Sequence, residues 1–134
     1  MPDKDYTARP LIDKLGIKPG ACVAVLGIND PAFVETLAAR TTNYCVGKCQ
    51  GACDVILLGV ETIADLRQLS ECRSAMTPAG GTWVIYPKGR KDITQAHVME
   101  AGLATGLVDN KVCSFSATHT GMRFVVRTKD RPKA

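Results

Sequence analysis

Continuous apolar runs are the strongest pattern in this sequence, and each has the length of a strand rather than that of a helix. They are Ala21–Ile28, Asp54–Val60 and Thr82–Pro87. Apolar runs without regular polar positions are typical of strands that are buried on both faces, as in a parallel sheet between two layers of helices. We therefore predict that these strands lie side by side and parallel at the centre of a sheet.

Segments with helical spacing separate these runs. One helix is expected to begin at Asp30, which is a good N-cap and precedes a proline suited to the first turn. A capping box at Thr62–Asp65 opens a second helix, whose apolar positions continue to Met76. Thr94–Thr105 is expected to form a third helix, and Pro10–Leu15 a short one near the N-terminus.

The remaining segments complete the predicted order β-α-β-β-α-β-α-β-β. Asn43–Val46 is predicted as a weak, short strand. Thr77–Gly81 contains proline and glycines, so it is expected to end the second helix and turn the chain. Lys111–Ser116 and Met122–Arg127 are predicted as an antiparallel pair, because apolar and polar residues alternate in the latter.

The chain is predicted to form a single domain over residues 1–134, with 1–20 as an N-terminal arm and 128–134 as a charged tail. The predicted fold class is α/β: a three-layer, Rossmann-like, mainly parallel sheet with a C-terminal antiparallel hairpin. No apolar run is long enough to cross a membrane, and the N-terminus has no apolar signal core. A cytoplasmic protein is therefore expected.

Longer stretches of the chain are similar to the Rossmann-like methyltransferases. Leu15–Leu26 resembles the approach to and course of their first strand, and Asp54–Leu58 resembles their fourth strand. Leu69–Ile85 resembles the helix, the glycine-rich lead and the fifth strand of that fold. The resemblance implies a truncated methyltransferase-like fold, because a whole strand–helix unit is missing between Asn43 and Asp54.

Shorter motifs resemble those of a narrower family. Tyr86–Lys88, Gly106–Cys113 and Gly121–Arg127 are similar to the recurring motifs of a family of small bacterial proteins, which is known only as a domain of unknown function. The resemblance extends from about Pro10 to Asp130, and Gly106–Cys113 is its most specific part. It implies a reduced methyltransferase-like core and brings no activity with it.

The turn after the first strand argues against the cofactor of the methyltransferases. These enzymes need a glycine-rich turn there and an acid at the end of the second strand to hold the ribose hydroxyls. Gly27–Pro31 contains one glycine, and Cys45–Cys53 contains no acid. As an N-cap, Asp30 also occupies the positive end of its helix. We therefore predict that no cofactor binds, and S-adenosylmethionine enters only in the alternative interpretation of the chain as a minimal methyltransferase.

A ligand is expected beyond the carboxyl ends of the parallel strands, where open α/β sheets bind theirs. Among the polar groups at that edge, Lys88 and Arg90 are the ones expected to meet an anion. Asp109–Lys111 is expected at the other edge of the sheet, as part of a turn. The residues predicted to gather at the ligand edge, next to Thr62 and Gly89, are Gly27, Asn29, Asp30, Glu61, Lys88 and Arg90.

Cysteines and histidines are the candidate metal ligands and catalytic groups of the chain. Cys45, Cys49 and Cys53 form the densest cysteine cluster, but their spacing is not that of a known zinc or iron–sulfur motif. We predict free, reduced thiols and no metal. The two histidines, His97 on a helix flank and His119 in a hairpin turn, are expected to face solvent. No nucleophile motif accompanies them, so no catalytic residue is predicted.

The uneven charge of the chain bears on its partners. The net charge is +4, and the part from Tyr86 onward carries +5 while the first 85 residues carry −1. We predict a non-enzymatic domain that binds a protein or a small anion, with no membrane partner and with a homodimer left open. The alternatives are a minimal S-adenosylmethionine-dependent methyltransferase and a nucleic-acid-binding module that uses the basic C-terminal third. An aromatic content of only 5% disfavours the last of these.

Overall fold

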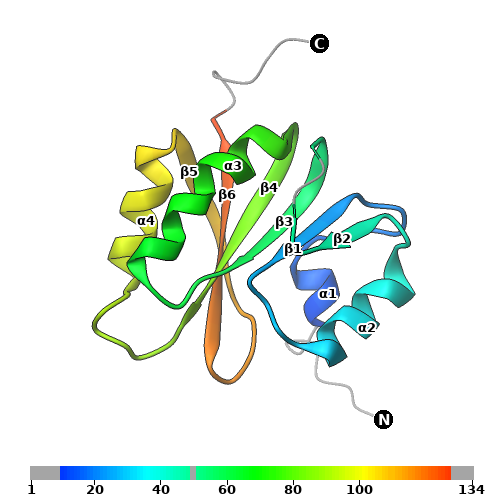
Figure 1. Ribbon diagram of the computed structural model, residues 1–134, viewed down its shortest axis with the longest axis horizontal. Coiled ribbons are helices and arrows are strands. Elements are labelled where there is room, and N and C mark those ends of the chain that lie inside the picture. Colours follow the sequence, from blue (N-terminus) through cyan, green and yellow to red (C-terminus); the bar gives the residue numbers. More distant parts are fainter. Residues whose placement is uncertain (1–9, 49–50, 128–134) are drawn as a thin grey trace.

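The computed structural model describes residues 10–48 and 51–127 of the chain. Within them six strands form one sheet in the order β2-β1-β3-β4-β6-β5 (Figure 1). All run in the same direction except β6, which lies antiparallel between β4 and β5. The strands are β1 (Val23–Leu26), β2 (Tyr44–Val46), β3 (Cys53–Gly59), β4 (Met76–Pro87), β5 (Leu107–Ser114) and β6 (His119–Val126).

This arrangement confirms the predicted fold class, a Rossmann-like and mainly parallel α/β sheet with an antiparallel C-terminal pair. The apolar runs form β1, β3 and β4, which are adjacent, parallel and central. Successive side chains of a strand point to opposite faces of its sheet. Ile56 and Leu57 of β3 are nevertheless both fully buried, so both faces of this sheet are covered.

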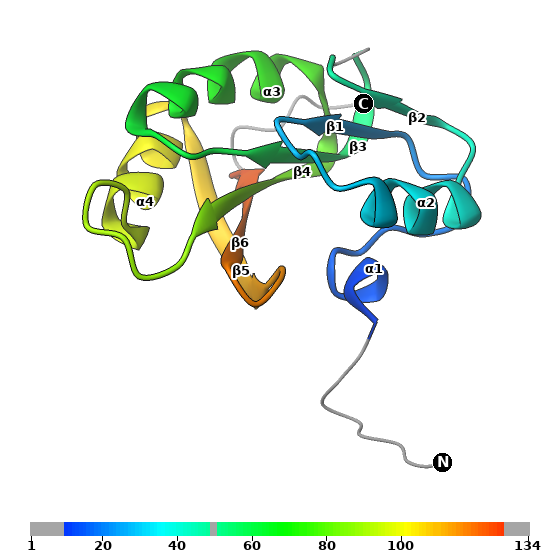
Figure 2. The same cartoon turned by 60° about the horizontal axis from the view of Figure 1, so that its bottom comes forward.

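Helices cover the two faces of the sheet (Figures 1 and 2). Leu37 packs into one core cluster with Trp83 of β4. Leu69 and Val98 pack into the cluster on the other face, with Phe124 of β6. Within the described residues, no helix is long and apolar enough to span a membrane. The helices are α1 (Leu11–Lys14) and α2 (Pro31–Arg40) on the first face, and the 3-10 helix η1 (Ile63–Gln68), α3 (Leu69–Ala75) and α4 (Gln95–Ala104) on the second.

The predicted helix starts are confirmed. The Phe33 amide donates a hydrogen bond of 3.1 Å to Asp30 Oδ1, which caps α2. Thr62 and Asp65 form the predicted capping box, in which the Asp65 amide donates to Thr62 Oγ1 over 3.3 Å. The segment that follows begins as η1 and becomes α-helical only at Leu69.

The segment Thr77–Gly81 differs from the prediction, because it belongs to β4 and does not form a turn. β4 starts directly after α3, at Met76. Met76 aligns with Cys53 of β3, whereas Gly81 aligns with Val55, so the residues between them lie in an irregularity of the ladder. The proline and glycines therefore mark a bulged strand here.

The start of β5 also differs from the prediction, since this strand already contains Asp109–Lys111. Asp109 pairs with Phe124 of β6, but the next regular pair joins Lys111 to Arg123. Asn110 is therefore an extra residue in the ladder, as in a β-bulge. Side chains after the bulge point to the opposite face from the one that regular alternation would give them.

The chain from Leu11 onward is anchored to the sheet. The indole nitrogen of Trp83, which is 1% exposed, donates a hydrogen bond of 3.0 Å to the Leu15 carbonyl. Arg40 of α2 adds a hydrogen bond of 2.7 Å to the Ile17 carbonyl and an ion pair of 2.8 Å with Asp13. These contacts hold α1 and the loop after it against the same face as α2.

Candidate functional site

A cavity of about 420 Å³ lies at the carboxyl edge of the sheet. It is formed where β1, β3 and β4 end and where the connection between β5 and β6 folds beside them. Its volume is within the range of small-molecule sites. The lining residues are Gly27, Ile28, Asn29, Asp30, Gly59, Glu61, Ile85, Phe115, Ser116, Thr118 and His119.

One wall of the cavity is formed where two glycines bring the ends of β1 and β3 together. Gly27 has a φ of +69°, which favours glycine, and a Cβ at this position would lie 2.5 Å from the Gly59 carbonyl oxygen. A Cβ at Gly59 would meet the Gly27 carbonyl oxygen at the same distance. The single glycine of the turn is therefore required by the contact between the strands, and backbone forms this wall.

The adjoining wall combines polar and apolar groups. Asn29 and Asp30 lie between β1 and α2, and the N-cap bond to α2 uses one of the two carboxylate oxygens of Asp30. Ile28, Ile85 and Phe115 supply the apolar part of the lining. A few polar groups within an apolar surface are typical of pockets that orient a small molecule.

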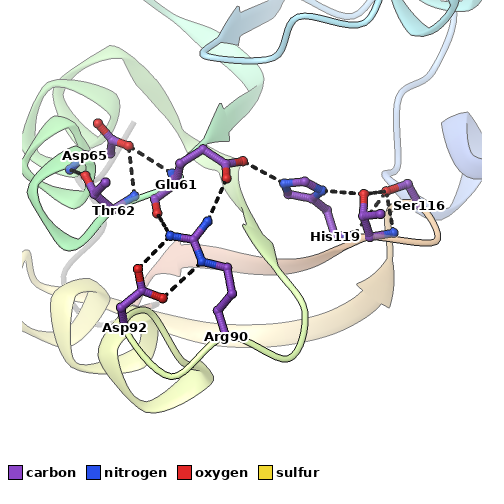
Figure 3. A network of polar contacts seen from close by, with 8 residues as sticks. Glu61, Thr62, Asp65, Arg90, Asp92, Ser116 and His119 are labelled. Carbon is purple, nitrogen blue, oxygen red and sulfur yellow. Dashed lines mark hydrogen bonds and ion pairs between the residues drawn. The ribbon is translucent and has the colours of Figure 1, made fainter.

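Two titratable side chains from distant parts of the chain meet at the cavity (Figure 3). His119 Nε2 lies 2.7 Å from Glu61 Oε2, and His119 Nδ1 lies 2.8 Å from Thr118 Oγ1. An ionised carboxylate only accepts hydrogen bonds, so we assign the imidazole proton to Nε2 and the role of acceptor to Nδ1. The result is a base that an acid orients and whose accepting nitrogen faces a hydroxyl.

Charged neighbours hold Glu61 in this position. Arg90 donates to Glu61 Oε1 over 3.0 Å and to the Glu61 carbonyl over 2.9 Å. Arg90 also pairs with Asp92 over 2.7 Å, and this hydrogen bond lowers the pKa of Asp92 and raises the pKa of Arg90. Because these ion pairs are exposed to solvent, we expect them to position Glu61 rather than to add much stability.

Asp65 completes the network shown in Figure 3. Its Oδ2 accepts hydrogen bonds from the amides of Glu61 at 2.9 Å and Thr62 at 3.1 Å. The bond from the Glu61 amide is the main cause of a lowered pKa of Asp65, which burial partly opposes. The backbone on both sides of the Glu61 side chain is thereby fixed.

The structure brings together only part of the predicted ligand edge. Lys88 and Arg90, the residues expected to meet an anion, do not line the cavity. Lys88 Nζ donates to Ser114 Oγ over 2.8 Å, and Arg90 is engaged by the two carboxylates described above. A role of the remaining residues in binding a ligand stays a prediction. Those that line the cavity are Gly27, Asn29, Asp30 and Glu61.

His119 is the main residue that the sequence patterns do not assign to the site. They place it in solvent, yet its side chain is only 27% exposed and lines the cavity. The antiparallel direction of β6 is the feature that could indicate this position. In an antiparallel pair the first residue of β6 lies beside the last residue of β4, and Pro87 pairs with His119 in this way. The other histidine, His97, accepts a hydrogen bond of 3.0 Å from the Thr94 amide and caps α4.

The cysteine cluster is only partly described. Cys45 lies on β2 and Cys53 begins β3, whereas Cys49 lies outside the described residues. Among residues 10–48 and 51–127, no group of three metal-ligating side chains is close enough to hold an ion. Cys53 Sγ lies 3.9 Å from the sulfur of Cys22. The prediction of reduced thiols without a metal therefore stays a prediction.

Comparison with solved structures identifies the fold as that of Rossmann-like methyltransferases. An S-adenosylmethionine-dependent methyltransferase from Aquifex aeolicus matches with a TM-score of 0.68 at 13% identity, over 87% of this chain and 88% of that one. CalO1, a methyltransferase of calicheamicin biosynthesis in its S-adenosylhomocysteine-bound form, matches with a TM-score of 0.64 at 17% identity, over 87% of this chain. The match covers 52% of CalO1, so this chain spans about half of that protein.

A third match is the O-methyltransferase NcsB1 of neocarzinostatin biosynthesis, in complex with S-adenosylhomocysteine and 1,4-dihydroxy-2-naphthoic acid. Its TM-score is 0.53 at 17% identity, over 77% of this chain and 41% of that one. Neither the family models nor the curated proteins give a match. The narrower resemblance to a bacterial family of unknown function therefore stays a prediction.

The expectation that the chain takes no cofactor is wrong in the light of these comparisons. Proteins with this fold include structures with S-adenosylhomocysteine bound and one that depends on S-adenosylmethionine. The turn at Gly27–Pro31 also leaves room for a ligand, because four of its residues line a cavity of about 420 Å³.

Proposed function

We propose that the chain is a minimal methyltransferase, which binds S-adenosylmethionine in the cavity at the carboxyl edge and acts on a hydroxyl group of an acceptor. The Glu61–His119 pair at 2.7 Å carries this proposal, because it sets an oriented base beside a cavity of suitable size. S-adenosylmethionine would supply an activated methyl group for attack by the acceptor oxygen. The structural neighbours support the choice of this cofactor.

The lining of the cavity suits an adenosyl group. Asn29 and Asp30 offer amide and carboxylate groups that would hold the ribose hydroxyls, a role that no acid at the end of β2 fills within the described residues. Ile28, Ile85 and Phe115 form an apolar surface that would take the adenine ring. The backbone wall at Gly27 permits close approach of the ligand.

The proton of the acceptor hydroxyl would leave through the hairpin between β5 and β6. Thr118 Oγ1 takes this proton while its own hydroxyl proton moves to His119 Nδ1, which lies 2.8 Å away. The imidazolium that forms faces the Glu61 carboxylate, which stabilises its charge. Arg90 keeps Glu61 in place throughout, through the side chain and the carbonyl of that residue.

Calorimetry with S-adenosylhomocysteine tests the cofactor site. We expect saturable binding of one molecule per chain, abolished by Asn29→Trp, whose indole would fill the cavity. Ser70→Trp, an exposed position on α3, is the matched control and should bind as the wild type does. Absence of saturable heat from the wild-type protein at millimolar ligand would contradict the proposal.

Methyl transfer from radiolabelled S-adenosylmethionine to phenols and hydroxy acids tests the base. Glu61→Gln and His119→Gln should each lower the rate about 10²-fold or more, since a positioned base contributes this much. Both variants should keep the affinity for S-adenosylhomocysteine within about twofold, because neither group is assigned to the cofactor. Full activity of His119→Gln on any acceptor would remove the imidazole from the mechanism.

A further inference from the structure

A second hollow, of about 330 Å³, adjoins the cavity at the carboxyl edge. Residues from α1, from the start of α2 and from the connection between β5 and β6 line it (Figure 2). Asp30, Phe115 and Ser116 line both spaces, so a ligand in the hollow lies at the border of the proposed cofactor site. The volume of the hollow is at the lower end of the range for small-molecule sites.

Two aromatic side chains line the hollow. Phe33 of α2 and Phe115, which directly follows β5, have ring centroids 5.2 Å apart and ring planes tilted by 53°. Aromatic rings favour tilted and offset contacts of this kind, so a further ring is well accommodated beside this pair. Residues 10–12, at the start of α1, supply further apolar surface. The hollow therefore suits a small aromatic ring system.

The polar groups of the lining disfavour an anion. Asp30 is the only charged residue among the described residues that line the hollow, and its carboxylate repels a negative ligand. The Thr36 hydroxyl already donates a hydrogen bond of 3.1 Å to the Ala32 carbonyl. A hydroxy acid would therefore find no cation for its carboxylate in this lining, whereas a neutral phenol needs none.

Ser116 connects the hollow to the base. Its Oγ lies 3.2 Å from Thr118 Oγ1, which in turn lies 2.8 Å from His119 Nδ1. The amides of Thr118 and His119 donate to Ser116 Oγ over 3.2 Å and 3.1 Å, and they hold this hydroxyl in place. A hydroxyl group of a ligand at the border of the two spaces is therefore next to a chain of polar contacts that ends at Glu61.

We propose that this hollow binds the ring of the methyl acceptor and that the acceptor is a neutral phenol, an inference that rests on the proposed methyltransferase function. The phenol oxygen forms a bond to the methyl carbon as the carbon–sulfur bond of the sulfonium breaks. The phenolic proton moves to Thr118 Oγ1, which passes its own proton to His119 Nδ1. A phenol suits an imidazole base better than an aliphatic alcohol does, because its hydroxyl has a pKa of about 10 rather than one near that of water.

Calorimetric titration with para-cresol, in the presence and absence of S-adenosylhomocysteine, tests the acceptor site. We expect saturable binding that Ala32→Trp and Thr36→Trp each weaken at least tenfold, because both exposed positions line the hollow and an indole would fill it. Ala39→Trp places the same side chain at an exposed position of α2 outside the lining and should bind para-cresol within twofold of the wild type. All four proteins should bind S-adenosylhomocysteine alike, since none of these positions lines the cavity.

A charged analogue tests the chemical class of the acceptor. In para-hydroxybenzoate a carboxylate replaces the methyl group of para-cresol, and we expect it to bind at least tenfold more weakly at pH 7. Asp30→Asn should reduce this difference, because asparagine keeps an N-cap for α2 but lacks the charge. In methyl-transfer assays, Ala32→Trp should raise the KM for para-cresol at least tenfold and change kcat much less.

Some results would overturn this inference and leave the proposed function standing. They are saturable binding of S-adenosylhomocysteine without binding of para-cresol, equal weakening by Ala32→Trp and Ala39→Trp, and tighter binding of para-hydroxybenzoate than of para-cresol. Binding of para-cresol that Ala32→Trp weakens, without any binding of S-adenosylhomocysteine, would confirm a phenol site in the hollow and contradict the methyltransferase proposal.

Discussion

Two separate constraints favour glycine at position 27, namely its left-handed backbone conformation and its close contact with Gly59. Alanine at this position must adopt a left-handed conformation and also place its Cβ 2.5 Å from the Gly59 carbonyl oxygen. We expect Gly27→Ala to lower the free energy of unfolding by about 2–5 kcal/mol, from the backbone conformation and the overlap together. Urea denaturation followed by circular dichroism measures this loss.

Gly89 provides the control for this substitution. Its φ of +71° is close to that of Gly27, but a Cβ at Gly89 would have nothing within 4 Å of it. Gly89→Ala should therefore cost only the backbone term of about 1–2 kcal/mol. If the two variants lose equal stability, the contact between β1 and β3 contributes nothing and the assigned role of Gly27 is wrong.

Asp65 links the stability of the protein to pH. Its pKa in the folded state is lowered, chiefly by the hydrogen bond from the Glu61 amide. A depressed pKa means that the carboxylate stabilises the fold above its unfolded pKa of about 4 and that this contribution is lost as the pH falls through the folded value. We expect Asp65→Asn to cost about 0.5–1 kcal/mol at pH 7, as for the loss of a charged cap, and almost nothing at pH 2.

Unfolding in urea at both pH values measures the effect of Asp65→Asn. Glu100→Gln removes one negative charge from an exposed position on α4 and is the matched control. Its effect should be small at pH 7 and at pH 2. A difference between the wild type and Asp65→Asn that persists unchanged at pH 2 would show that the carboxylate charge is not what stabilises this turn.

At the scale of elements, α4 rests on β6 through a helical glycine. A Cβ at Gly102 would overlap the ring of Phe124, which is fully buried. Alanine is the better helix former by about 1 kcal/mol, yet overpacking against a buried ring costs about 1–3 kcal/mol, so we expect net destabilisation by Gly102→Ala. The double variant with Phe124→Leu should lose less stability in urea denaturation than the two single effects predict together, because leucine leaves space for the added methyl group.

The elements with uniform apolar runs are the ones that sequence patterns predict well. The predicted strands Ala21–Ile28, Asp54–Val60 and Thr82–Pro87 overlap with the observed β1, β3 and β4. A strand that is buried on both faces needs a continuous apolar run, and such a run is easy to recognise in a sequence. The pattern at Thr77–Gly81 predicts a turn instead of the observed strand, since proline and glycine look alike in a turn and in a bulged strand. Only pairing with β3, which depends on distant residues, decides between them.

The candidate site is harder to predict than the strands, because its Glu61–His119 pair joins a residue that follows β3 to the first residue of β6. Asn29, Asp30 and Glu61 follow their strands directly, and the general rule for open sheets places them correctly. The contact of His119 with Glu61 depends on the direction of β6, since only an antiparallel strand starts at this edge. Lys88 obeys the same rule as Glu61 but bonds to Ser114, which no local pattern indicates.

At the scale of the whole molecule, one buried hydrogen bond joins the N-terminal part to the sheet. Trp83→Phe removes the donor to the Leu15 carbonyl and leaves that oxygen without its partner. We expect a loss of about 1–3 kcal/mol in the free energy of unfolding and faster cleavage by trypsin after Lys14, because the loop that follows this residue is released. Tyr86→Phe, on the same strand, should leave the cleavage rate unchanged, and equal rates in all three proteins would contradict this anchor.

The bulge in β5 also affects whether strands of other chains can pair with the edge of the sheet. β5 is an outer strand, and an outer strand with a regular ladder is a template on which foreign strands can assemble into aggregates. Asn110 interrupts the ladder near its middle, and exposed Asp109 and Lys111 bring charge to the same stretch. At the opposite rim β2 has only three residues, too few to start such growth. The bulge at Asn110 thus protects the folded chain from adding strands at its longer open edge.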